Sequence, residues 1–187
     1  MQRKHLAAVD DLQREGLGQL GVDYPLTDLG NAEAFRDLHK GAVRYVVPRK
    51  AWLIWSDGRW RPDPNDEVRR RAKETVRLLA HQAVELEGKE RQLAIKHVAI
   101  SEAEPKLRAL LTLAQSELPI ALAGDATDRD PWLLACGNGT LDLRTGALRA
   151  HDPDDLISLG PTCRTTRTRR APDGCGSSAR SSTATRS

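Results

Sequence analysis

Three of the chain's four tryptophans fall within nine residues, in the stretch WLIWSDGRW at 52–60. Indole rings can stack on nucleic-acid bases for about 1 to 3 kcal/mol per base, and nearby arginine or lysine can bind the phosphates. The alternative is that the rings form the core of a small β-element, and we favour this core, with one ring exposed. The basic residues beside the tryptophans, and therefore candidate nucleic-acid ligands, are Arg44, Lys50, Arg59 and Arg61.

A second basic group follows in the segment 65–88, where apolar residues recur at helical spacing and predict an amphipathic helix. Its polar side carries Arg69, Lys73 and Arg77 four residues apart, so all three share one face. A solvated helix face is the simpler interpretation, and binding of DNA phosphate or of an acidic partner is the alternative. The expected buried residues are Val68, Ala72, Val76, Leu79, Ala83 and Leu86.

Catalytic and metal-binding patterns are not found in the sequence. The glycine-rich stretch GNGTLDLRTG at 137–146 lacks the Lys-Ser/Thr ending of a phosphate-binding loop and precedes a predicted strand. The three cysteines have no CxxC spacing, and the five histidines are scattered. We therefore expect no catalytic residues, no metal ligands and no cofactor in this chain.

Local signals predict an α+β fold, with helices packed on short antiparallel hairpins. Asp57-Gly58 is a strong two-residue hairpin signal that places Trp55 opposite Trp60. Asn31 is expected to cap a short helix that ends near Gly41, and another helix starts near Pro105. Two later turn signals, at 138–139 and 145–146, predict two hairpins or a three-stranded meander.

Charge and composition divide the chain into a lead-in at 1–25, a domain at 26–159 and a tail at 160–187. The whole chain carries a net charge of +3, but the tail holds six arginines and one aspartate, which leaves −2 for the rest. The tail contains no leucine, isoleucine, valine or aromatic residue, so we expect it to be disordered. Its composition is also typical of a GC-rich gene read out of frame. With no apolar run long enough to span a membrane and no signal peptide, we expect a cytoplasmic protein without membrane contact.

Taken in order, the segments at 27–39, 43–63, 72–79, 106–117 and 130–157 resemble one domain. It is the domain that precedes the ATPase in phage- and plasmid-encoded primase-helicases, a family related to the poxvirus replicative helicase-primase. The motif residues that carry the resemblance, which we interpret as structural, are Trp52, Trp55, Asp57, Gly58, Trp60, Asn138, Gly139, Asp142 and Gly146.

The resemblance implies a role in DNA replication of a mobile element, as an accessory or collar module. In the family a superfamily 3 helicase core follows, which hydrolyses ATP with Mg²⁺ and forms a ring on DNA. The present sequence has no Walker A motif, so we expect a C-terminally truncated relative, shortened by a frameshift and inactive alone. DNA and helicase subunits of the same family are the expected partners. The alternative is a free-standing nucleic-acid- or protein-binding module without catalytic activity.

Overall fold

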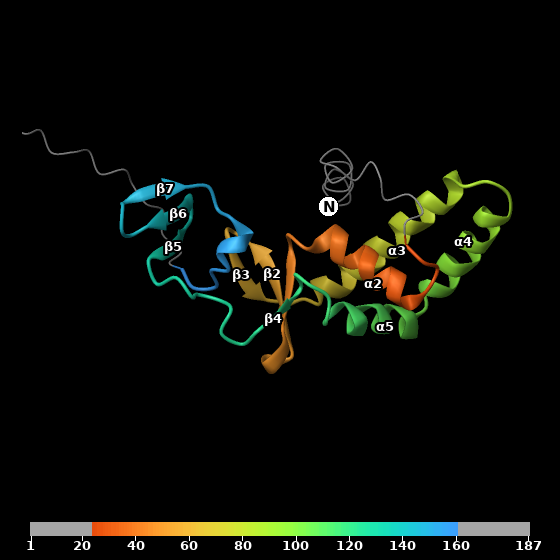
Figure 1. The fold of residues 1–187 in the computed structure, drawn as a ribbon, viewed down its shortest axis with the longest axis horizontal. Helices are drawn as coiled ribbons and strands as arrows, with labels where there is room; N and C mark the ends of the chain where they lie inside the picture. Colours follow the sequence, from red (N-terminus) through yellow and green to blue (C-terminus); the bar gives the residue numbers. More distant parts are fainter. Residues whose placement is uncertain (1–23, 161–187) are drawn as a thin grey trace, which may run out of the picture.

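The computed structural model describes residues 24–160, which form a layer of helices and two β-sheets (Figure 1). This arrangement confirms the predicted α+β class. Residues 1–23 of the lead-in and 161–187 of the tail, including the predicted disorder, lie outside the described part. The helices are α2 (Asp28–His39), α3 (Glu67–Glu85), α4 (Gly88–Ser101) and α5 (Glu104–Ala114). The strands are β1 (Val43–Val46), β2 (Ala51–Ser56), β3 (Arg59–Pro62), β4 (Ala121–Leu122), β5 (Leu133–Cys136), β6 (Gly139–Asp142) and β7 (Ala147–Arg149).

The tryptophan hairpin, β2–β3, forms with the predicted register. Asp57 and Gly58 have φ values of 51° and 74°, as a type I′ turn requires. Trp55 consequently lies opposite Trp60 in the antiparallel pair. Glycine is needed at the second turn position for a further reason, since a Cβ atom there would lie 2.3 Å from the ring of His151.

The first sheet has the strand order β3-β2-β1-β4, and it buries a different set of side chains on each face. One face, with Val43, Tyr45 and Ile54, packs against the helices. The other, with Val46, Leu53 and Trp60, packs against Leu156 of the C-terminal segment. β4 pairs with β1 in parallel, so the sheet is not built from hairpins alone. Both faces are covered, which explains why the hairpin sequence is apolar on both sides.

The helical layer follows the predicted periodicity closely. In α3, Val68, Ala72, Val76 and Ala83 are buried, while Leu79 is only partly covered. Leu86, also predicted to be buried, follows the end of the helix and is only partly covered. The carboxylate of Asp63 accepts hydrogen bonds from the backbone N–H groups of residues 67 and 68, at 2.9 and 3.0 Å, and so caps the helix. No helix within residues 24–160 is long and apolar enough to cross a membrane.

Helix α2 begins earlier than predicted, and its cap is a different residue. Thr27 occupies the N-cap position, and its hydroxyl accepts a hydrogen bond from the Gly30 N–H at 3.1 Å. The prediction that Asn31 caps this helix is wrong, because Asn31 lies buried inside it. The Asn31 side chain donates instead to Ser101 Oγ, at 3.0 Å. A buried amide needs such a partner, and it is supplied by a residue 70 positions away.

His39 ends α2 in a fully covered position against α3. Thr75 donates its hydroxyl proton to the carbonyl of Arg71, at 3.0 Å. The Thr75 oxygen therefore accepts from His39 Nε2, 3.1 Å away, and the other ring nitrogen, Nδ1, is left buried without a hydrogen-bond partner. Burial lowers the pKa of His39 to about 3, and the positive charge of Arg71 lowers it further in the same direction.

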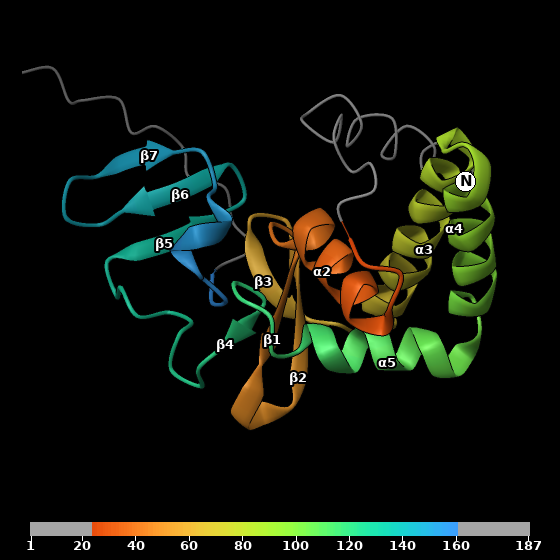
Figure 2. The same cartoon turned by 45° about the vertical axis from the view of Figure 1, so that its right-hand side comes forward.

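The second sheet has the antiparallel order β5-β6-β7 and confirms the predicted meander. Figures 1 and 2 show the first sheet between this meander and the helices. The segment after β7, which contains the short 3₁₀ turn η2 (Pro153–Asp155), joins the two sheets. Ile157 accepts a backbone hydrogen bond from Trp60, at 2.8 Å, and Asp155 pairs with Arg149, at 2.5 Å.

Candidate nucleic-acid interface

The three hairpin tryptophans each pack against another aromatic ring of the protein. Trp60 has 0% exposure, and its indole N–H donates to the Pro153 carbonyl at 2.8 Å. The Trp55 ring packs against it with centroids 5.3 Å apart. On the opposite face of the sheet, the Trp52 ring contacts Tyr45, 4.9 Å away. Trp60 is therefore covered on all sides, whereas Trp52 and Trp55 pack against protein side chains and remain partly exposed.

Arg44 belongs to the same buried assembly. Its guanidinium lies 4.8 Å from the centre of the Trp60 ring and 3.3 Å from a carboxylate oxygen of Asp154. The side chain is 3% exposed. Burial lowers the pKa of Arg44 from its ordinary value, while the charge of Asp154 opposes that effect. Arg44 therefore joins the first sheet to η2, and we do not include it among the groups available to phosphate.

Three arginines line a hollow of about 330 Å³ beside β3, the edge strand of the first sheet. We call this hollow, defined by Arg49, Arg59 and Arg61, the arginine groove. Leu53, Trp60 and Pro62 also line it, together with residues 127, 158 and 159. Arg49 ends the short 3₁₀ turn η1 (Val47–Arg49), which connects β1 to β2, and the other two arginines are on β3.

The arginine groove is only partly neutralised by the protein itself. Arg61 pairs with Asp57 at 3.0 Å, and its Nε atom is buried without a hydrogen-bond partner. Arg59 donates to the carbonyl of Gly160. Arg49 forms no ion pair with any residue from 24 to 160, and neither does the neighbouring exposed Lys50, which does not line the hollow. The groove thus combines a concave shape with excess positive charge, which suits a phosphate group.

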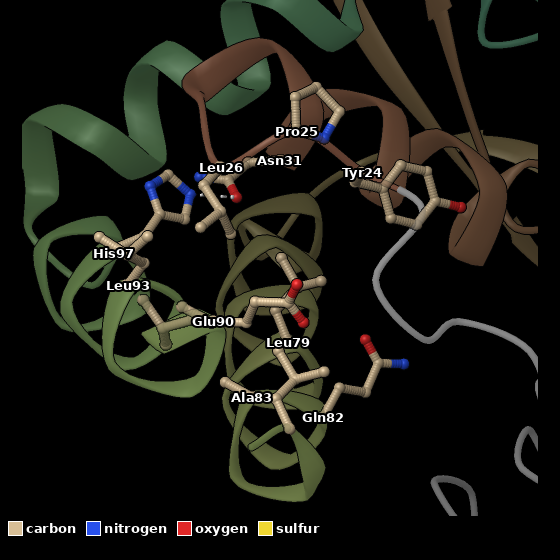
Figure 3. Close-up of a pocket in the computed structure, with 13 residues that line it drawn as sticks. Tyr24, Pro25, Leu26, Asn31, Leu79, Gln82, Ala83, Glu90, Leu93 and His97 are labelled. Carbon is tan, nitrogen blue, oxygen red and sulfur yellow. Dashed lines mark hydrogen bonds between the residues drawn. The ribbon is translucent and has the colours of Figure 1, made fainter. Parts of the chain in front are cut away.

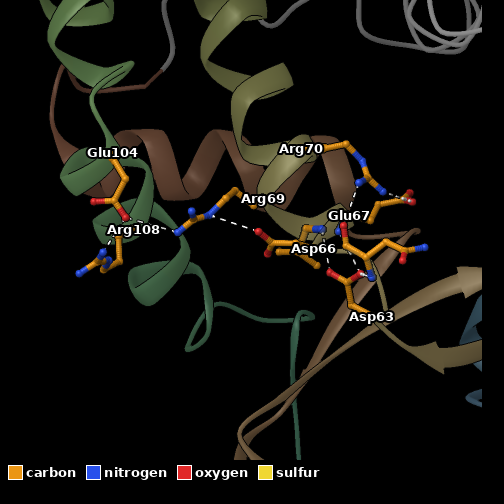
Figure 4. A network of polar contacts seen from close by, with 9 residues as sticks. Asp63, Asp66, Glu67, Arg69, Arg70, Glu104 and Arg108 are labelled. Carbon is orange, nitrogen blue, oxygen red and sulfur yellow. Dashed lines mark hydrogen bonds and ion pairs between the residues drawn. The ribbon is translucent and has the colours of Figure 1, made fainter.

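The basic stripe on α3 lies on the helical side of the first sheet, away from the arginine groove. Figure 4 shows Arg69 between two carboxylates: Asp66, at 3.5 Å, and Glu104 of α5, at 3.4 Å. Lys73 and Arg77 are exposed, and neither forms an ion pair within residues 24–160. Only these two members of the stripe are therefore free of a protein carboxylate in the described part of the chain.

Other basic side chains at the start of α3 are also paired. Glu67 accepts from Arg70 at 3.3 Å and from Arg71 at 2.8 Å. Arg108 of α5 shares Glu104 with Arg69, at 2.6 Å from the same oxygen atom. In this network the carboxylates of Glu67 and Glu104 offset the positive charge of the arginines beside them, so these arginines attract an external anion only weakly.

The motif residues of the second sheet also have structural roles. Gly139 has a φ of 152°, and a Cβ atom there would lie 2.4 Å from the carbonyl oxygen of Arg149. Asp142 accepts a backbone hydrogen bond from Gly146, at 2.7 Å, and one from Arg144 to its side chain, at 2.8 Å. Asn138 precedes Gly139 in the exposed β5–β6 turn. These positions specify turn geometry.

A serine, a histidine and an asparagine lie together between α2 and α4 without the geometry of a catalytic triad. His97 Nε2 lies 3.1 Å from Asn31 Oδ1 and 3.3 Å from Ser101 Oγ, so one ring nitrogen faces both partners. In a triad the two partners use different ring nitrogens. Ser101 is also buried and donates to the His97 carbonyl. Within residues 24–160, no group of three histidine, cysteine, aspartate or glutamate side chains is arranged to hold a metal ion.

Arg49 and Trp132 were not identified from the sequence. Arg49 precedes a strand by two residues, and strand alternation gives no indication of where a side chain in a 3₁₀ turn points. Trp132 is the most exposed tryptophan of the described part, at 48%. The guanidinium carbon of Arg144 lies over its ring, 5.7 Å from the ring centre. An isolated aromatic residue before a short strand gives no sequence signal for exposure.

A family model described as "D5 N terminal like" matches residues 32–164, which is well over half of the chain. No curated protein matches the sequence. The matched segment contains the tryptophan hairpin, all three helices that pack with α2, and the whole second sheet. The chain thus belongs to the D5 N terminal like family, the N-terminal domain of phage and plasmid primase-helicase proteins.

Proposed function

We propose that this protein is an accessory domain of a phage- or plasmid-type DNA primase-helicase, that it acts in replication of a mobile element, and that it contacts DNA through the arginine groove. The family membership supports the first part of the proposal. The observation that supports the DNA contact is the hollow lined by Arg49, Arg59 and Arg61. Helicase subunits of the same family are the proposed protein partners, and ATP and Mg²⁺ would bind to those subunits.

The chemistry of the groove favours contact with the DNA backbone. Guanidinium groups bind phosphate oxygens in a bidentate manner, and their planar shape fits a groove lined by other side chains. Trp60, the hairpin tryptophan that lines this hollow, is buried, so the proposed contact relies on the arginines and not on base stacking. Phosphate contacts carry no base information. The proposed binding is therefore independent of DNA sequence and decreases steeply with salt.

The test is a pair of charge reversals, Arg49→Glu with Lys50→Glu, assayed by fluorescence anisotropy with labelled single-stranded and duplex DNA at several salt concentrations. Neither residue forms an ion pair within residues 24–160, so their replacement breaks none there. We expect the affinity to fall about tenfold at low salt. The slope of log affinity against log salt should become shallower by about 0.9 for each duplex phosphate contact that is lost.

The DNA affinity of the Arg49/Lys50 variant is compared with that of two further double variants. Lys89→Glu with Arg91→Glu makes the same charge change at exposed positions of α4, outside both basic surfaces, and should reduce binding much less. Lys73→Glu with Arg77→Glu makes the same change on the α3 stripe. If the α3 variant loses affinity and salt slope while the Arg49/Lys50 variant keeps both, the contact is on α3 and the groove proposal is wrong.

A further inference from the structure

An apolar hollow of about 290 Å³ lies between α3, α4 and the first residues of the described chain. Figure 3 shows its side chains converging from the two helices and from the segment before α2. We call it the α3–α4 groove, and the apolar residues that define it are Leu26, Leu79, Ala83, Leu86, Leu93 and Ala94. Two of its polar side chains, Asn31 and His97, already bond each other.

Helix α4 is the least covered helix next to this groove. Leu93 lines the groove and is nevertheless 60% exposed. A leucine that is fully buried contributes about 1.5 to 3 kcal/mol relative to an exposed one. The α3–α4 groove therefore has an apolar wall that would gain stability from a further apolar segment.

The course of the chain indicates which segment this is. Tyr24, Pro25 and Leu26 line the groove, so the described part of the chain begins beside it. The preceding sequence has apolar residues Leu6, Val9 and Leu12 three residues apart, followed by Leu17 and Leu20. The first three positions share one face of a helix. A 15-residue helix is about 22 Å long, close to the roughly 21 Å of the 14-residue α4.

We propose that residues 6–20 of this chain bind in the α3–α4 groove and cover Leu93. The intervening Gly16 and Gly18 make this segment a weak helix former by itself, so its order would depend on the groove. A segment attached at the mouth of the groove has an effective concentration in the millimolar range, which favours it over a separate partner. The docked segment would add a further helix to the helical layer, beside α3 and α4. The inference does not depend on the proposed DNA contact.

The test is a double-mutant cycle in the full chain, with Leu6→Ser/Leu12→Ser in the segment and Leu93→Ser in the groove. We expect each change alone to lower the Tm by about 3 to 10 °C. The combined variant should lose little more than either one, because both remove the same contact. The matched control is Ile95→Ser on α4, since Ile95 is exposed at 44% but does not line the groove. Its effect should add to that of the segment variant.

Amide hydrogen exchange gives a second readout that does not depend on overall stability. In the unmodified chain the amides of residues 6–15 should be protected, and Leu93→Ser should remove this protection while Ile95→Ser leaves it intact. Fully additive Tm shifts, or unprotected amides in the unmodified chain, would overturn the proposal. A molar mass by light scattering that shows a dimer, dissociated by Leu93→Ser, would instead identify a second copy as the occupant.

Discussion

Replacing Trp60 by alanine tests whether the tryptophan hairpin is core or a binding platform. The change removes a ring with 0% exposure, together with its contact to Trp55 at 5.3 Å. It also removes the indole hydrogen bond to the Pro153 carbonyl and the face on which the Arg44 guanidinium stacks. One substitution thus weakens both the hairpin and the joint between the first sheet and η2.

The expected loss can be worked out from these contacts. Truncation of a buried aromatic residue to alanine costs about 3 to 5 kcal/mol, which includes the cavity that remains. The lost hydrogen bond contributes about 0.5 to 1.5 kcal/mol of stability, and it leaves the Pro153 carbonyl with the Leu156 N–H, at 3.2 Å, as its remaining donor. Water that enters the cavity can solvate Arg44 and offsets part of this cost. We therefore expect the free energy of unfolding to fall by about 3 to 5 kcal/mol, a large share of the 5 to 15 kcal/mol typical of a domain.

The assay is urea-induced unfolding followed by circular dichroism at 222 nm, with three variants compared. Trp60→Phe retains an aromatic ring but loses the N–H donor, and it should lie between the unmodified chain and Trp60→Ala. Trp132→Ala is the matched control, because that ring is 48% exposed, and it should cost less than about 1 kcal/mol. An unchanged unfolding midpoint for Trp60→Ala, combined with weaker DNA binding, would refute the core assignment and restore the stacking platform.

Three further predictions concern the tail, pH and nucleotide hydrolysis. Deleting residues 161–187 should leave the Tm unchanged, as measured by calorimetry, and should weaken nonspecific DNA binding because the net charge changes from +3 to −2. A clearly lower Tm would show that the tail is docked. Because the folded pKa of His39, about 3, lies below the unfolded value near 6.5, its contribution to stability is complete above pH 6.5 and is lost as the pH falls toward 3. His39→Gln should therefore reduce the loss of stability between pH 7 and pH 5 by about 2 kcal/mol in urea unfolding, and an unchanged pH dependence would contradict this. The purified chain should show no ATP hydrolysis in a phosphate-release assay, because the sequence contains no Walker A motif; turnover abolished by a point mutation in this chain would contradict it.

Local chemistry explains why several elements could be predicted from the sequence. The Asp57-Gly58 pair specifies a hairpin turn and its register, since few residues adopt positive φ at two successive positions. The apolar spacing in α3 specifies which face is buried, because the helical repeat decides it within a few turns. The β5–β7 meander follows from its turn signals in the same way. These predictions depend on residues that are neighbours in the sequence.

The remaining features depend on contacts between distant residues, and only the tertiary structure decided them. The two residues of β4 carry no strand signal and pair with β1 more than 70 positions earlier. Arg44 and Arg59 both lie on strands of the first sheet, yet Arg44 is buried because Asp154 and Trp60 enclose it. Arg49 reaches the arginine groove because η1 turns the chain beside residues 158 and 159. A sequence shows which side chains carry charge, but their availability to a ligand depends on which distant segment packs over them, and that is settled only when the whole chain folds.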